Sequence, residues 1–384
     1  MKMKRLVAGA ILAAALINTR ILADDAAPAA PADAAPKKPG LTLVNLHLQQ
    51  AMPQDAFDEL AKQGGVKFTT MGNFWDQPNM QTENDIDMTD KPFWSAVNQV
   101  CNLWGLAPQQ NNWGPNPSPK QIQLNFSGNG QKGKAPVFES DGFLVQALSF
   151  NRNQSVNYAM PEQSQNNCSV QLMVFIDPSL HISNFNQNPK VTVAVDDAGH
   201  SMVPDANNNV FYGGMQQRSM IYNLNVGLKY PDNAGKKISD LKFTLSMRGS
   251  DTLDSLSVDK PLEAAESSKN FGDTTVVFHS AKKNGNGYEV KIGITNDQQN
   301  GGNAWGTLQS AQLLDAKGRA YNYGGGGGGG GRPDGLAEYT INYMANGGMP
   351  QDNPSGDPVK WVLELPAKTH AIKVPVEFKD LPLP

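Results

Sequence analysis

The segments VAVDDAGHS (residues 193–201) and QLLDAKGRA (residues 312–320) decide how we interpret the carboxy-terminal two thirds of the chain. In each, an apolar run is followed by an aspartate and, three positions later, by a glycine. The two glycines, Gly199 and Gly318, are 119 positions apart. Aspartate caps tight turns and glycine accepts the positive φ angle that many of them require. The spacing therefore predicts that the same turn between strands occurs twice.

Neighbouring segments repeat at nearly the same distance. VQLMVFID (170–177) and YEVKIGIT (288–295) place Ile176 and Ile294 118 positions apart. LKFTL and WVLEL begin at Leu241 and Trp361, 120 positions apart. A steady offset is the sign of an internal duplication.

The duplication predicts two tandem β-sandwiches, at residues 136–262 and 263–384. LSVDKPL (256–262) is expected to close the first copy, and IKVPVEFKDLPL (372–383) the second. Short apolar runs separated by turn residues are typical of such sandwiches. The runs are Phe143 to Phe150, Val170 to Ile176, Lys190 to Val195, Met220 to Leu228, Leu241 to Met247, Thr274 to His279, Tyr288 to Ile294, Leu308 to Leu314, Glu338 to Tyr343 and Lys360 to Leu365.

The composition agrees with strands joined by many turns. Charged residues make up only 18% of the 384, while the chain contains 37 Gly, 26 Pro, 36 Asn and 25 Gln. This mixture excludes a coiled coil or a charged disordered chain. The net charge of −4 offers no basic surface for nucleic acid.

Residues 1–23 have the pattern of a secretory signal peptide. Lys2, Lys4 and Arg5 precede the uncharged apolar run from Leu6 to Ile17, and cleavage is expected near Ala23. Because a span needs about 20 apolar residues, this run is too short to cross a bilayer, although a retained amino-terminal anchor is the alternative. We expect an exported, periplasmic or extracellular protein with no membrane span in the mature chain.

An Ala/Pro-rich linker is expected at residues 24–40, since the segment DDAAPAAPADAAPKKPG has nothing to bury. Loss of residues 1–23 removes four basic residues and no acidic one, so the net charge becomes −8.

Residues 41–127 predict a small α/β module. LTLVNLHL reads as a strand, Pro53 suits the first turn of a helix, and Gly65 ends it. The pattern recurs: a strand from Thr82 to Met88 precedes a second helix that ends at Gly105. Several positions of the two units match at an offset of 40, which indicates a doubled strand–helix–strand unit.

The segments LTLVNLHLQQAMPQDAFDELAKQGGVKF and DIDMTDKPFWSAVNQVCNLWGLAP resemble the short N-terminal domain of secretins and TonB-dependent receptors. The resemblance implies a periplasmic module that contacts partner proteins and is not an enzyme. The chain departs from that family downstream, where it has no secretin pore region and no series of barrel strands. The remainder resembles tandem immunoglobulin-like β-sandwiches of exported bacterial proteins.

Phe74 and Trp75 are candidate partner contacts, because the segment MGNFWDQPNM is longer than a tight strand connection. The alternative is that both rings fold back over the small core of the module.

Trp113 and Trp305 lie in Asn/Gly-rich segments and are candidate platforms for stacking a sugar. Cys101 and Cys168 are expected to be separately buried thiols, with a disulfide as the alternative.

Glycine-rich segments carry no cofactor site in this interpretation. Residues 128–135 match phosphate-loop spacings, but an extended segment follows them where a helix is required, so we expect a linker. The eight glycines at 324–331 either wrap a ligand or, more simply, form the tip of a hairpin.

No spacing of the five histidines or of the acidic residues predicts a metal site or a catalytic set. We therefore expect no cofactor and a non-enzymatic scaffold or adaptor that binds an envelope protein. The alternatives are a carbohydrate-binding surface protein and an unrecognised hydrolase.

Overall fold

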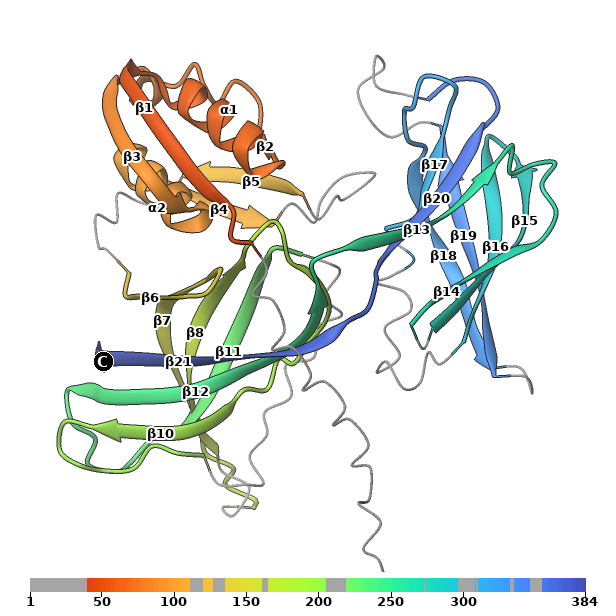
Figure 1. The fold of residues 1–384 in the computed structure, drawn as a ribbon. Coiled ribbons are helices and arrows are strands. Elements are labelled where there is room, and N and C mark those ends of the chain that lie inside the picture. Colours follow the sequence, from red (N-terminus) through yellow and green to blue (C-terminus); the bar gives the residue numbers. More distant parts are fainter. Residues whose placement is uncertain are drawn as a thin grey trace, which may run out of the picture. The chain divides into compact units, whose positions relative to one another are not determined.

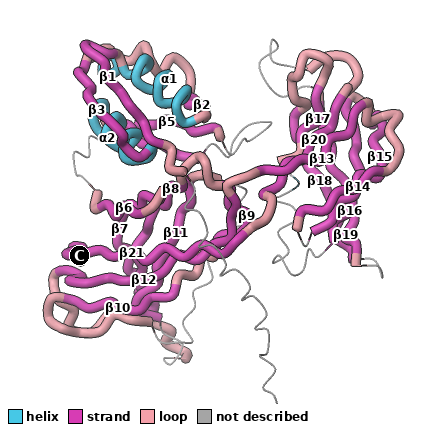
Figure 2. The backbone as a smooth tube through the Cα atoms, viewed as in Figure 1, coloured by secondary structure: helices cyan, strands magenta, loops and turns pink. Residues whose placement is uncertain are grey.

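The computed structural model of the chain describes residues 40–110, 120–126, 135–160, 165–204, 219–272, 274–295, 308, 310–331, 335–345 and 354–384. Within them the fold is mainly β, and both α-helices lie in the amino-terminal part (Figure 2). The predicted signal peptide (1–23), residues 24–39 of the linker, residues 128–134 of the glycine-rich linker, Trp113 and Trp305 lie outside the described residues.

The amino-terminal α/β region, residues 43–126, contains the predicted strand–helix–strand order twice. Its elements are β1 (Leu43–Ala51), α1 (Pro53–Gly64), β2 (Lys67–Thr69), the 3₁₀ turn η1 (Pro78–Met80), β3 (Asn84–Pro92), α2 (Phe93–Trp104), β4 (Leu106–Gln110) and β5 (Gln121–Phe126). Strands β1 and β3 form an antiparallel pair, while β5 lies between β2, to which it is parallel, and β4.

Both helices end where the sequence predicts. Gly65 and Gly105 follow α1 and α2 with φ angles of 60° and 66°, and each donates its backbone N–H back into its helix. Glycine takes this left-handed conformation without the steric cost that a Cβ atom brings. The faces predicted from helical spacing, including Ala56, Leu60 and Val100, are buried.

The first two-sheet region comprises residues 137–250 and 370–382. One sheet has the order β11-β8-β7-β6, made of β6 (Val137–Ser140), β7 (Phe143–Ser155), β8 (Gln165–Ile176) and β11 (Ile221–Lys229). The other has the order β10-β12-β21, with β9 also paired to β12; these strands are β9 (His181–Phe185), β10 (Lys190–Asp196), β12 (Lys237–Ser250) and β21 (His370–Pro382). Side chains from both sheets form one apolar core.

The second two-sheet region comprises residues 253–366. A three-stranded sheet has the order β13-β20-β17, made of β13 (Leu253–Asp259), β17 (Gln312–Leu314) and β20 (Lys360–Pro366). A five-stranded sheet has the order β14-β15-β16-β19-β18, made of β14 (Ser267–Phe271), β15 (Thr274–Asn284), β16 (Gly287–Thr295), β18 (Asn322–Gly331) and β19 (Leu336–Met344). The two sheets again share one core.

The expected boundary between the two copies is wrong for two strands. Strand β21, which we expected to close the 263–384 copy, pairs with β12 from Lys237↔Pro382 to Gly249↔His370. It buries Val374, Val376 and Phe378 in the core of the first region. Strand β13, expected to close the 136–262 copy, pairs instead with β20. The alternating pattern predicted strands here but held no information about which sheet each would join.

The chain therefore crosses between the two-sheet regions twice. Strand β12 is followed directly by β13, and β20 is followed directly by β21 (Figure 1). Across this double crossing the backbone N–H of Ala367 donates to the carbonyl of Thr252 at 3.0 Å.

The glycine run is a strand and not the hairpin tip that we expected. Strand β18 pairs antiparallel with β19 at the edge of the five-stranded sheet. Glycine is required at position 328, since a Cβ atom there would lie only 2.3 Å from a main-chain oxygen.

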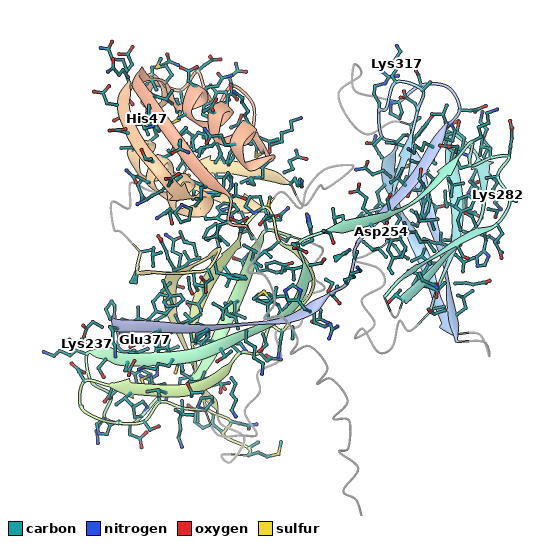
Figure 3. All side chains as sticks on the ribbon, viewed as in Figure 1. His47, Lys237, Asp254, Lys282, Lys317 and Glu377 are labelled. Carbon is teal, nitrogen blue, oxygen red and sulfur yellow. The ribbon has the colours of Figure 1, made fainter. Side chains whose placement is uncertain are left out.

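The predicted aspartate–glycine turn is present in both two-sheet regions. Asp196 Oδ1 accepts the N–H groups of Ala198 and His200, and Asp315 Oδ1 accepts those of Lys317 and Arg319. Gly199 and Gly318 have φ angles of 87° and 74°. Figure 3 marks the second turn by Lys317.

Burial alone would raise the pKa of both aspartates, but the hydrogen bonds to each carboxylate outweigh burial and lower its pKa to about 2. The duplication thus extends to two buried, ionised carboxylates, Asp196 and Asp315.

Candidate interaction surface

A row of five aromatic rings lies along the α/β region. Phe57 contacts Phe68 at a centroid distance of 5.0 Å and Trp75 at 6.1 Å, and Trp75 contacts Phe74 at 5.2 Å. Phe126 stacks on Phe74 at 4.5 Å, with the ring planes 25° apart. We call these five residues the aromatic row.

Each ring comes from a different place in the chain. Phe57 lies on α1, Phe68 on β2 and Phe126 at the end of β5, while Phe74 and Trp75 belong to the connection between β2 and β3. A hydrogen bond holds the main chain of that connection in place: the Gln81 side-chain amide donates to the carbonyl of Trp75 at 2.7 Å. The row is therefore held by strands at both ends and by a hydrogen-bonded connection in the middle.

The row passes from the core to the surface. Phe57 is buried, Phe68 and Trp75 are half-buried, and Phe126 is 42% exposed. Met71, in the same connection as Trp75, is 73% exposed. Aromatic rings and methionine that remain partly in water and rest on a rigid core are common at protein–protein contacts.

The structure corrects one of the two predicted contact residues. Phe74 is only 6% exposed, because its ring lies between those of Trp75 and Phe126 and closes the core. Trp75 keeps part of its surface in water. The alternative that both rings fold over the core is thus correct for Phe74 and correct in part for Trp75.

Sequence reasoning missed Phe126 and Met71. Phe126 ends a strand whose pattern is alternating, QIQLNF, with Ile122 and Leu124 buried. That alternation predicts the Phe126 side chain on the buried face too, and only the end of the sheet leaves it partly uncovered. Met71 had no neighbouring apolar residue to mark it as part of a surface.

A buried seam joins the α/β region to the first two-sheet region. The indole N–H of Trp94 donates to the carbonyl of Ile176 at 2.7 Å, and its ring lies 4.8 Å from that of Phe175. The buried carboxylate of Asp177 accepts the main-chain N–H and the hydroxyl of Thr42. A hydrogen bond of 2.7 Å from Ser95 to Glu139 crosses the same seam. A cavity of about 230 Å³ lies along it.

A second cavity of about 370 Å³ lies in the second two-sheet region, at the β15–β16 turn. Asn284, Asn286 and Asn342 supply amides to its lining, and Tyr288 and Tyr343 also line it. Both tyrosine rings are almost fully buried. The cavity therefore offers hydrogen-bonding groups, while these rings have no open face on which a sugar could stack.

Three histidines pair with carboxylates in three separate places. His47 Nδ1 lies 2.6 Å from Asp87 on the exposed face of β1 and β3, and His279 Nδ1 lies 2.6 Å from Glu266. The third pair, His200 with Asp196, belongs to the first aspartate turn. Among the residues that the structure describes, no group of three or more His, Cys, Asp or Glu side chains has the geometry of a metal site.

The two cysteines are buried and not bridged, as expected. Burial raises the pKa of the Cys101 thiol far above its usual range. Burial also raises the pKa of Cys168 to about 12, against the smaller opposing effect of Arg152, and its thiol donates to the carbonyl of Leu228. Both groups are therefore protonated thiols at neutral pH.

Comparison with known proteins adds no assignment to this surface. No family model matches the chain, and neither the curated proteins nor the solved structures contain a significant match. Across the described ranges, no helix combines the length and apolar character needed to traverse a bilayer.

Proposed function

We propose that this chain is an exported, non-enzymatic protein of the cell envelope that acts as a protein–protein interaction scaffold. In this proposal the α/β region binds a partner protein through the exposed end of the aromatic row. The observation that carries it is the stack of Phe126 on Phe74, which holds a partly exposed ring on a buried one.

The order of elements supports the proposal. The doubled strand–helix–strand unit of the α/β region is the order implied by its resemblance to the short N-terminal domain of secretins and TonB-dependent receptors. We propose that the α/β region is such a module and that the two-sheet regions are immunoglobulin-like sandwiches. Export and cleavage near Ala23 are part of the same proposal, and amino-terminal sequencing of the mature protein tests them.

The seam makes the α/β region a fixed part of the scaffold. Trp94 donates a buried hydrogen bond to the carbonyl of Ile176, and Thr42 donates a partly buried one to Asp177. A partner bound to the aromatic row would thereby be placed at a defined position relative to the first two-sheet region.

A pair of matched variants of the full mature chain tests the proposed surface. Phe126→Ser removes the exposed ring, and Val359→Ser removes a side chain of similar exposure, 41%, from the second two-sheet region. After crosslinking in intact envelopes, proteins that co-purify with the wild type are quantified for both variants. Because central aromatic contacts are typically worth about 2 kcal/mol or more, Phe126→Ser should reduce the main partner at least tenfold. Equal recovery from Phe126→Ser and the wild type would contradict the proposal.

A further inference from the structure

The β7–β8 hairpin is longer than its counterpart in the duplicated region. Pairing starts at Phe143↔Ile176 in the first region and at Val276↔Ile294 in the second. We align the two hairpins on these first pairs. The last pair before the β15–β16 turn, Asn284↔Gly287, then corresponds to Asn151↔Ser169. The β7–β8 hairpin continues beyond that point with the pairs from Arg152↔Cys168 to Ser155↔Gln165. The second region thus shows that the two-sheet architecture does not require this extension.

The described part of the extension beyond β7 lies in water. From Arg152 to Met160 every residue except the half-buried Asn157 is exposed. Apolar side chains at its end are open to solvent, with Tyr158 92% and Val156 58% exposed. Residues with so little burial contribute little to the core, so another role must account for them.

Strand β6 covers only part of the outer edge of β7 in the residues that the structure describes. Strand β6 pairs with β7 only from Phe143 to Gln146, and the N–H of Ala147 then bonds to the carbonyl of Pro136. Among the described strands, none pairs with the outer edge of β7 from Leu148 to Ser155. An edge of this kind presents main-chain donors and acceptors to any extended chain that approaches it.

The equivalent edge in the second region carries more charge than the β7 edge. Strand β14 pairs with β15 as far as Phe278, and the stretch beyond carries Lys282 and Lys283 (Lys282 is marked in Figure 3). Lysine on an edge strand is a common natural barrier to pairing with another chain. The β7 stretch SFNRNQS has a single charge, Arg152, whose guanidinium lies 3.9 Å from the ring centroid of Tyr230 on its own chain.

We propose that two copies of this chain associate by pairing their β7 edges, antiparallel about a twofold axis. In a twofold contact each side chain faces the same patch of the other copy, so a charged edge repels itself. The mature chain also carries a net charge of −8, which opposes self-association through most of its surface. The nearly uncharged β7 edge meets both requirements, which identifies a second copy as its occupant.

The glycine strand β18 is another long uncharged edge among the described strands, and its geometry is less suited to pairing. Its register with β19 is irregular between Tyr323 and Gly325 and again between Gly328 and Gly330. Bulges of this kind twist an edge away from a flat pairing surface.

Sedimentation velocity of the full mature chain over a range of concentrations tests the proposal. The wild type should form a dimer, and Asn151→Lys/Asn153→Lys should weaken the dimer at least tenfold. The matched control is Ser169→Lys/Gln171→Lys, which adds the same charge to β8, a strand paired on both edges. The control should dimerise as the wild type does. A monomeric wild type, or equal dimerisation of all three proteins, would overturn the proposal.

Crosslinking through an introduced thiol provides an independent readout that does not depend on charge. Asn151→Cys should yield a disulfide-linked dimer under mild oxidation, and Gln171→Cys should not. The native thiols do not interfere, because Cys101 and Cys168 are buried. Equal crosslinking of the two variants would exclude pairing through the β7 edge.

Discussion

The two two-sheet regions share part of their strand order, but one is completed by a strand that follows the second region and the other by a strand that precedes the second copy. In each region one strand, β12 or β20, pairs with a strand from outside the expected copy to which it belongs. Strand β12 takes β21 from the end of the chain, whereas β20 takes β13, which precedes the second copy. The second region is therefore one continuous segment, whereas the first also needs residues 370–382.

Truncation at the carboxy terminus should destabilise the first region and leave the second region folded. Removal of residues 367–384 withdraws Val374, Val376, Phe378 and Leu381 from the first core, and burial of such a side chain is worth about 1.5–3 kcal/mol. Because the total approaches the 5–15 kcal/mol that holds a typical domain folded, the first region should unfold. Hydrogen exchange should show protection retained in residues 253–366 and lost in β12.

A peptide of residues 370–382 added in trans is the control for this truncation. It should restore protection in β12, because the main-chain pairing and the apolar face reside in β21 itself. If β12 in the truncated chain keeps its protection without the peptide, the first region does not depend on β21, which would contradict the proposed difference between the two regions.

Replacing each buried aspartate by asparagine should lower the free energy of unfolding by a different amount. Asp315 Oδ2 accepts the Nε–H of Arg319 and the main-chain N–H of Ser355, and it forms an ion pair with Arg319 Nη2 at 2.7 Å. Asp196 Oδ2 accepts the N–H of Gly235 and faces a histidine, which is charged only when protonated. Since hydrogen bonds to charged groups are worth about 1.5–3 kcal/mol, Asp315→Asn should cost about 3 kcal/mol and Asp196→Asn about 2. Urea unfolding at pH 7 measures both, and a larger loss for Asp196→Asn would reverse the ranking.

Acid should weaken both regions over the same pH range. The pKa of each aspartate is lowered to about 2 by its hydrogen bonds, and an unfolded aspartate titrates near 3.9. A lowered pKa stabilises the fold above the unfolded value and loses that effect as the pH falls toward the folded value. Each carboxylate should thus contribute about 2–3 kcal/mol at pH 5 that is gone by pH 1.

The double variant Asp196→Asn/Asp315→Asn checks the acid prediction. Its free energy of unfolding should change less between pH 5 and pH 2 than that of the wild type. An unchanged slope would assign the acid sensitivity to other carboxylates.

The sequence predicted local structure well and strand partners poorly. Helix ends at Gly65 and Gly105 and turns at Gly199 and Gly318 follow from backbone requirements that a single residue meets. The partner of β21 depends on which of two similar cores its apolar face enters, and both cores accept the same alternating pattern.

Two other features were also beyond sequence reasoning. Eight glycines carry no pattern, so only pairing with β19 makes them a strand. For the candidate surface, the burial of Phe74 depends on Phe126, a residue distant in the sequence. Exposure at the end of a sheet is a property of the assembled fold, which local spacing does not encode.

The smallest expected effect tests how closely the duplicated turns match. A Cβ atom at Gly199 or Gly318 would have no heavy atom within 4 Å, so alanine there costs only the strain of a positive φ angle. That strain is roughly 1 kcal/mol for a non-glycine residue. Gly199→Ala and Gly318→Ala should therefore lower the free energy of unfolding of their own regions by about the same amount. Gly318 lies in the continuous region, and Gly199 lies in the region that needs β21. Unequal losses in urea unfolding would therefore mean that pairing with a distant strand changes the stiffness of the turn.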